Sequence, residues 1–190
     1  FGKIIASAFH FDIDGITLAK IGKRTENEFI GLQSGIMDQF IIAMGKKDSA
    51  ILLDTASLSY EYIPLNIEPY RIIVMNSNKP RKLSESKYNE RKNECYVALA
   101  FLKQKTDIRF LCSLTPSSYK PFEKDVSCYL GETVARRVRH CVSEMERVRA
   151  SAAALQKNDI TALGRLLKES HLSLKNDYEV TGRELDSLFF

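Results

Sequence analysis

Seven apolar side chains in the second half of the sequence repeat at alternating steps of four and three residues, and no other feature constrains the fold as much. They are Val134, Val138, Cys141, Met145, Val148, Ala152 and Leu155. This spacing predicts a long packed helix with one narrow apolar seam. The turn-forming pair Asn158-Asp159 follows, and residues 160–174 resume the helical pattern. The two segments therefore predict a helical hairpin.

Other helix signals lie on both sides of this hairpin. Residues 86–105 have apolar side chains at helical spacing, and Thr115-Pro116 is a cap followed by proline at the first helical position. Thr181-Gly182-Arg183-Glu184 matches a capping box that opens a further helix. The second half of the chain is therefore expected to be rich in helix.

The first half combines helices with strands. Residues 1–29 predict two helices joined by a turn, the first with an apolar stripe made of Ile4, Ile5, Ala8 and Phe9. Ser34 is expected to cap a short helix over residues 35–44. Three strand-like runs follow, at residues 50–54, 60–65 and 70–76. The most plausible domain boundary lies between the last two runs, at residues 66–69.

Composition argues against several classes of protein. Of the 190 residues, 44% are hydrophobic and 27% are charged, so the chain can bury a core and is not expected to be disordered. The 28 basic and 24 acidic residues are spread out, which gives no support for a nucleic-acid partner, and no apolar run is long enough to cross a membrane. The four cysteines lack metal-binding spacing, as is typical of reduced thiols in a cytoplasmic protein. The sequence begins and ends in the middle of secondary-structure patterns, so we expect it to be a fragment.

A few polar residues could carry chemistry. Asp38 lies near the start of the short helix, where an ionised carboxylate could accept a proton from a hydroxyl or simply stabilise the helix. Either Glu26 or Glu28 could help to hold a magnesium ion, although the residues alone favour ordinary surface charge. The Tyr88 hydroxyl could bond a sugar, or its ring could pack on a helix. No glycine-rich phosphate loop is found, so a nucleotide would need residues outside this sequence.

A series of short segments, taken together and in order, resembles the galactokinases, a family of the GHMP kinase superfamily. Two of them read Glu26-Asn27-Glu28-Phe29-Ile30-Gly31 and Gly35-Ile36-Met37-Asp38-Gln39-Phe40. The others lie at residues 45–54, 76–78, 86–91, 136–140, 169–171, 177–181 and 184–186. The resemblance implies an α+β fold in two domains. Residues 1–66 would be part of the N-terminal, nucleotide-side domain, and residues 67–190 an incomplete, helix-rich and ferredoxin-like C-terminal domain.

The resemblance also implies an activity, namely ATP-dependent phosphorylation of the anomeric hydroxyl of α-D-galactose. By position, Asp38 matches the catalytic aspartate, Gly35 and Tyr88 match residues that contact the sugar, and Glu26 matches the glutamate that helps to hold magnesium. Galactose, ATP and Mg²⁺ would be the ligands of a cytoplasmic protein, expected to be a monomer. Nucleic acid and membrane are not expected as partners.

The sequence departs from the family pattern in ways that leave alternatives open. Ser34 stands where the family commonly has Cys, and three family blocks are missing, including the phosphate loop that would cradle ATP. We therefore expect these residues alone not to catalyse the reaction. The alternatives are a non-catalytic galactokinase-like sensor that binds galactose and acts through a protein partner, and a sister kinase acting on another sugar.

Overall fold

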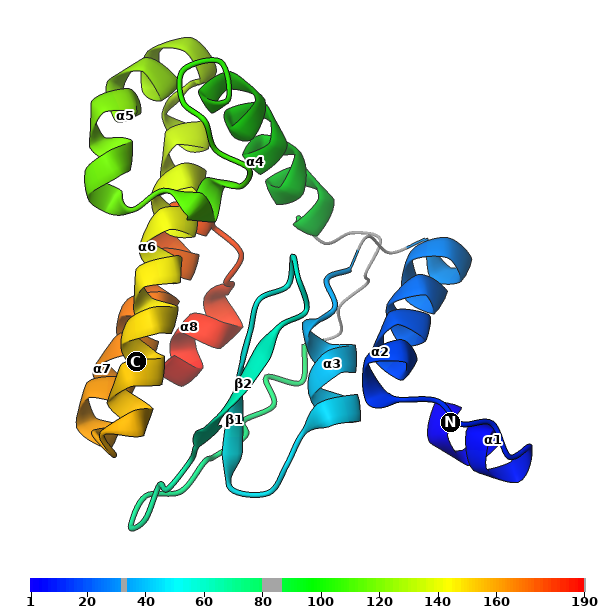
Figure 1. The fold of residues 1–190 in the computed structure, drawn as a ribbon. Coiled ribbons are helices and arrows are strands. Elements are labelled where there is room, and N and C mark those ends of the chain that lie inside the picture. The colour runs from blue at the N-terminus through cyan, green and yellow to red at the C-terminus, as the bar shows by residue number, and fades with distance from the viewer. Residues whose placement is uncertain (32–33, 80–86, 190) are drawn as a thin grey trace. The chain divides into compact units, whose positions relative to one another are not determined.

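The computed structural model describes residues 1–31, 34–79 and 87–189. Contacts within the chain divide it into two compact units, Phe1–Ile67 and Glu68–Phe190 (Figure 1). The division falls within the segment 66–69 that the sequence indicates as a boundary, and the assignment of each unit to a kinase domain stays a prediction. In the described ranges, no helix has the length and apolar character needed to cross a bilayer.

Four helical segments form most of the first unit. They are α1 (Gly2–Ala8), α2 (Gly15–Arg24), the π-helix η1 (Thr25–Ile30) and α3 (Met37–Met44). Asp14 caps α2, because its Oδ1 accepts a hydrogen bond from the Thr17 amide at 2.9 Å. Helices α2 and α3 pack together, and their contact buries Ala19 and Phe40 almost completely.

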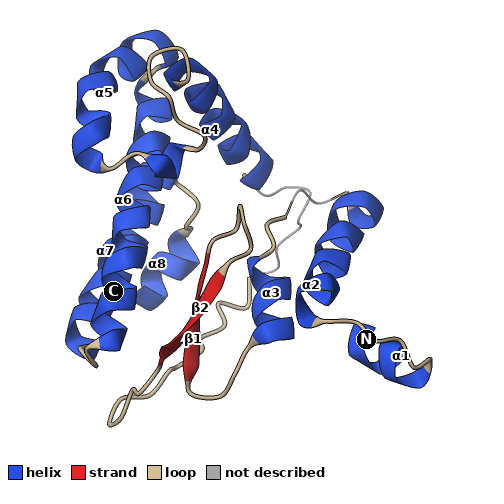
Figure 2. Ribbon diagram, viewed as in Figure 1, coloured by secondary structure: helices blue, strands red, loops and turns tan. Residues whose placement is uncertain are grey.

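A two-stranded antiparallel sheet completes the first unit (Figure 2). Strand β1 (Ser49–Leu53) pairs with β2 (Tyr60–Pro64). The sheet is joined to α3 by the edge-to-face contact of the Tyr60 and Phe40 rings, 5.3 Å apart, and by the hydrogen bond that the Tyr62 hydroxyl donates to the Met44 carbonyl at 2.6 Å. The hairpin therefore fixes the helix that begins at Met37.

Two expectations for apolar segments are wrong. Residues 70–76 form no strand, and Ile72, Ile73 and Val74 are 69%, 76% and 91% exposed. A strand requires a hydrogen-bonded neighbour, and within the described residues none lies along this segment. The first helix forms, but Ile4 and Phe9 of its expected apolar stripe are 69% and 67% exposed, whereas Ala6 is buried.

Helices make up the regular structure of the second unit. They are α4 (Tyr88–Leu102), the 3-10 turn η3 (Leu111–Ser113), α5 (Pro116–Leu130), α6 (Glu132–Gln156), α7 (Ile160–Ser173), the π-helix η4 (Leu174–Tyr178) and α8 (Arg183–Phe189). Thr115 caps α5 with a capping box, as the sequence predicts, and Asp159 caps α7 by accepting from the Ala162 amide at 2.9 Å. Helices α6 and α7 pack as the predicted hairpin.

Helix α6 is the centre of the second unit, because α4, α5, α7 and η4 all contact it. Its buried surface is broader than the predicted seam. Ala135, Val138 and Val142 are buried, and so are the polar residues Arg137 and His140. Val148, which the seam should have covered, is 41% exposed. A helix packed on several sides buries a band of residues instead of the single stripe expected for one neighbour.

Candidate functional site

Asp38 lies in the first turn of α3 with its side chain exposed. Phe40, two residues further along, is only 1% exposed and anchors the opposite side of the same helix. Within the described residues, no hydrogen bond or ion pair involves the Asp38 carboxylate. The local sequence therefore presents a carboxylate to solvent from a helix whose other face is held in the core.

Glu26 lies on η1 and is half-buried. The Ser34 hydroxyl donates a 2.5 Å hydrogen bond to Glu26 Oε2 and also lies 3.2 Å from Asn27 Oδ1. The predicted capping role of Ser34 is wrong, because α3 begins only at Met37 and no side chain caps it. A hydroxyl bonded to a carboxylate forms a stronger interaction than a neutral cap, which explains this choice of partner.

Gly35 lies between Ser34 and the start of α3, and it is exposed. A Cβ atom added at this position would meet no other atom within 4 Å. The packing of the described residues therefore does not require glycine here, and the backbone of Gly35 is open on that side. Such a position allows a ligand to approach the main chain closely.

Tyr88 is the first residue of α4 and belongs to the second unit. Its side chain lies outside the described part of the structure, so the predicted sugar contact stays a prediction. The first unit brings Glu26 beside Ser34, with Gly35 and Asp38 following within the next four residues of the chain. These are the candidate site residues whose surroundings the structure describes.

A basic pocket of about 350 Å³ borders η1 in the first unit. Its charged lining residues are Lys20, Lys23, Arg24 and Glu28, and Glu28 forms an exposed ion pair with Arg24 at 3.2 Å. Sequence reasoning missed this pocket. The signal was present, since positions 20, 23 and 24 share one face of a helix.

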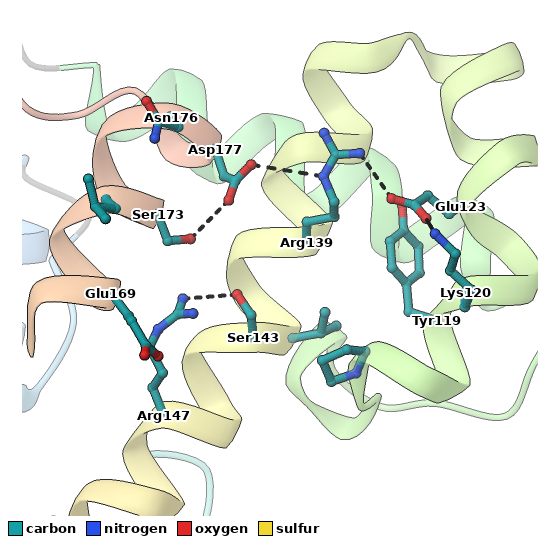
Figure 3. Close-up of a pocket in the computed structure, with 13 residues that line it drawn as sticks. Tyr119, Lys120, Glu123, Arg139, Ser143, Arg147, Glu169, Ser173, Asn176 and Asp177 are labelled. Atoms are coloured by element: carbon teal, nitrogen blue, oxygen red, sulfur yellow. Dashed lines mark hydrogen bonds and ion pairs between the residues drawn. The ribbon is translucent and has the colours of Figure 1, made fainter. Parts of the chain in front are cut away.

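A second pocket, of about 520 Å³, lies in the second unit and contains none of the predicted site residues (Figure 3). Arg139 crosses it, donating to Glu123 at 2.9 Å and lying 3.9 Å from Asp177. The Tyr119 hydroxyl is buried without a hydrogen-bond partner in the described residues, and burial raises the pKa of Tyr119. The three basic and three acidic side chains of the lining balance, so the pocket has no charge preference for a phosphate.

A buried charged network explains several of the segments on which the resemblance rests. Arg137, which is 1% exposed, donates to Glu94 on α4 at 2.7 Å and to Glu179 at 2.6 Å. Arg91, which is 2% exposed, donates to Glu94 at 3.0 Å and to the Tyr178 carbonyl at 2.7 Å. Hydrogen bonding by Arg137 holds the pKa of Glu179 below its usual value.

The network gives these segments a structural role. Arg91, Arg137 and Glu179 come from three of these segments, far apart in the sequence, and meet in this one charged network. Packing within the second unit therefore accounts for Arg91, Arg137 and Glu179 of these segments. The basic run at residues 136–140 lies in a helix, as the sequence indicates, and its three arginines bind acidic residues of the same unit.

Comparison with known proteins identifies one kind of relative. No family model matches the chain. The chain is 48% identical to a galactokinase of Staphylococcus carnosus over 187 residues, which is 98% of this chain and 47% of the relative. A galactokinase of Clostridium perfringens is 47% identical over 186 residues, with the same coverage of each chain. The chain thus spans about half the length of the curated relatives it matches.

A solved structure gives the same result for the fold. The chain superposes on the galactokinase of Lactococcus lactis, solved in complex with galactose, with a TM-score of 0.88 and 42% sequence identity. The match covers 97% of this chain and 47% of that one. The predicted α+β fold of the GHMP kinase type is confirmed, and so is the resemblance to the galactokinases.

Proposed function

We propose that this galactokinase-like chain is part of an ATP-dependent kinase that phosphorylates the anomeric C1 hydroxyl of α-D-galactose. The observation that carries the proposal is the match to galactokinases along 98% of the chain, together with a structural relative solved with galactose. The product would be galactose 1-phosphate, and the other product would be ADP. We place the residues that bind the ATP phosphates outside this sequence, because it contains no glycine-rich phosphate loop.

Asp38 is proposed as the catalytic carboxylate. The C1 oxygen of the sugar attacks the γ-phosphorus of ATP, the bond from that phosphorus to the bridging oxygen breaks, and ADP leaves. Asp38 accepts the hydroxyl proton or holds the hydroxyl in line for this attack, since phosphoryl transfer depends mainly on positioning and charge stabilisation. Its exposed carboxylate on a helix anchored by Phe40 suits either role.

Gly35 and Tyr88 are proposed as contacts to the sugar. The open space beside Gly35 leaves room for a ring against the backbone, and the Tyr88 hydroxyl would form one hydrogen bond. These two contacts bind and orient the substrate without taking part in bond making. The sugar itself offers hydroxyl groups of the kind that a tyrosine can donate to or accept from.

Glu26 is proposed to help hold Mg²⁺. Within the described residues, no cluster of three or more potential ligands is present, which fits an ion bound mainly through phosphate oxygens, with one or two carboxylates. The hydrogen bond that Ser34 donates to Oε2 orients the Glu26 carboxylate. A bound Mg²⁺ supplies charge compensation for the phosphates.

The catalytic assignment is tested by Asp38→Ala in the full-length protein. Turnover should fall by about 10²- to 10⁴-fold, because the group that accepts or positions the proton is lost, while ATP binding changes little. The matched control is Asp12→Ala, which removes an exposed aspartate of the same unit. Steady-state kinetics and ATP titration calorimetry measure the two effects. Turnover of Asp38→Ala near that of the control would exclude Asp38 as the catalytic residue.

The sugar contact is tested by Tyr88→Phe, again in the full-length protein. Loss of one hydroxyl contact, worth about 0.5–1.5 kcal/mol, should raise the galactose KM by roughly 2- to 13-fold and leave kcat nearly unchanged. Tyr96→Phe is the control on the same helix, since the Tyr96 side chain is 56% exposed. An unchanged KM would remove Tyr88 from the sugar site.

A further inference from the structure

Two cysteines from neighbouring helices lie in contact in the second unit. Cys95 is on α4 and Cys141 is on α6, and their Sγ atoms are 3.8 Å apart. Both side chains are half-buried thiols, and α4 packs directly on α6. The two sulfur atoms therefore need to approach by less than 2 Å to reach the length of a disulfide bond, about 2.05 Å.

The surroundings of Cys95 favour its thiolate. The hydrogen-bonding contact with the thiol of Cys141 lowers the pKa of Cys95 to about 7, and the Tyr178 hydroxyl, 3.8 Å from Cys95 Sγ, acts in the same direction. The same interaction raises the pKa of Cys141. Cys95 is thus the more readily ionised thiol and the expected nucleophile, and Cys141 is the thiol that keeps its proton.

We propose that Cys95 and Cys141 form a redox-sensitive dithiol site, which a hydroperoxide converts into a reversible disulfide between α4 and α6. In the first step the Cys95 thiolate attacks one peroxide oxygen, the O–O bond breaks, and Cys95 is oxidised to a sulfenic acid while the peroxide is reduced. With hydrogen peroxide, the leaving hydroxide takes a proton and becomes water.

In the second step Cys141 resolves the sulfenic acid. Its sulfur attacks Cys95 Sγ, the S–S bond forms, the S–O bond breaks, and the departing hydroxide takes the Cys141 proton. The balance is two thiols and one hydrogen peroxide giving one disulfide and two waters. A dithiol reductant reverses the reaction. This site uses none of the residues proposed for sugar phosphorylation, so the two proposals can fail independently.

The location of the pair gives the disulfide a structural consequence. Cys95 follows Glu94, which receives hydrogen bonds from both Arg91 and Arg137, and Tyr178 precedes Glu179, which receives one from Arg137. The bond would therefore form beside the charged network, at the contact between α4 and α6, and would replace the interaction of Cys95 with the Tyr178 hydroxyl.

The test is peroxide oxidation of the full-length protein, followed by alkylation with N-ethylmaleimide and peptide mapping without reduction. A peptide pair linked through Cys95 and Cys141 should appear, with the mass of two hydrogen atoms lost, and dithiothreitol should abolish it. Cys128 is exposed and should remain alkylated, which makes Cys128→Ser the control that leaves the linkage intact. Complete alkylation of both Cys95 and Cys141 after peroxide treatment would overturn the proposal.

Two variants separate the roles of the two thiols. In Cys141→Ser the sulfenic acid has no resolving partner, so dimedone should label Cys95. In Cys95→Ser the nucleophile is lost, so peroxide should leave Cys141 as a thiol that alkylates after denaturation. Dimedone labelling of Cys141 in place of Cys95, or a disulfide to Cys112 in the parent protein, would contradict the assignment.

Discussion

The two units of the chain differ in how they are held together. In the first unit the fully buried cluster consists of Ala19, Ile36 and Phe40, while Phe29 and Ile42 are 87% and 84% exposed. In the second unit ten buried side chains form one cluster around α6, and the buried arginines Arg91 and Arg137 lie beside it with their glutamate partners. The described residues of the second unit are thus stabilised both by apolar packing and by internal ion pairs.

Three of the four residues proposed for function lie in the first unit, and the fourth, Tyr88, belongs to the second. Glu26, Gly35 and Asp38 lie in the lightly packed unit, on positions that the fold leaves partly or fully open to solvent. In the second unit the charged residues of the network, Arg91, Glu94, Arg137 and Glu179, are engaged with one another. Functional side chains need free hydrogen-bonding capacity for a substrate, whereas structural ones satisfy each other, and the two units represent these two uses of polar residues.

The largest effect is expected from Arg137→Ala in the second unit. Removing this guanidinium takes one cationic partner from Glu94 and one from Glu179, which keep Arg91 and Arg136 respectively. The free energy of unfolding should therefore fall by about 1.5–3 kcal/mol, the value for hydrogen bonds to charged groups. The control is Arg149→Ala on the same helix, an exposed position where a change of about 0.5 kcal/mol or less is expected. Urea unfolding followed by circular dichroism measures both.

The result tests whether internal ion pairs distinguish the second unit from the first. A loss for Arg137→Ala no larger than that for Arg149→Ala would mean that the network is not what stabilises the second unit. In that case its buried apolar cluster alone would distinguish it from the first unit.

Local signals allowed much of the fold to be predicted from the sequence. The cap at Thr115, the turn at 158–159 and the helical periods around them depend on residues within a few positions of one another, and these elements formed as expected. The strand at 70–76 failed because a strand depends on a partner, which its own sequence does not specify.

The interactions that the sequence could not indicate are long-range ones. Arg137 reaches partners 42 and 43 positions away, and the Ser34 hydroxyl turns back to Glu26 in place of capping α3. Such partners become visible only once the helices are packed. The candidate site residues were found through motif resemblance, since spacing alone favoured an ordinary helix or surface charge for both Asp38 and Glu26.

A smaller effect is expected from Asp14→Ala in the first unit. Its carboxylate accepts hydrogen bonds from the amide and the hydroxyl of Thr17, so the substitution removes the side-chain cap of α2. Because this unit has a small buried cluster, the loss should appear as faster hydrogen exchange of the α2 amides, with the α6 amides unchanged. Asp12→Ala, in the same turn, is the control. Equal exchange in the two variants would argue that packing, not capping, limits the stability of α2.

The smallest effect concerns the pH dependence of the second unit. His140 is 7% exposed, its Nδ1 lies 3.0 Å from the Ser173 hydroxyl, and its ring stacks on Tyr178. Burial lowers the pKa of His140 below its ordinary value of 6.5, against the opposing influence of Glu144 and Asp177. The unfolded chain therefore takes up a proton at a higher pH than the folded chain does. The stability from this group is present above pH 6.5 and falls as the pH drops toward the folded pKa.

Between pH 7 and pH 6 this loss should amount to at most about 0.7 kcal/mol, the value for a histidine that stays neutral in the folded state. His140→Gln should remove that part of the pH dependence, while the titration of Cys95 contributes equally to both proteins and cancels. His10→Gln, at an exposed position in the first unit, should keep the pH dependence of the parent protein. Urea unfolding of the three proteins at several pH values measures the difference. If His140→Gln retains the full pH dependence of stability, other buried polar groups of the second unit are responsible for it.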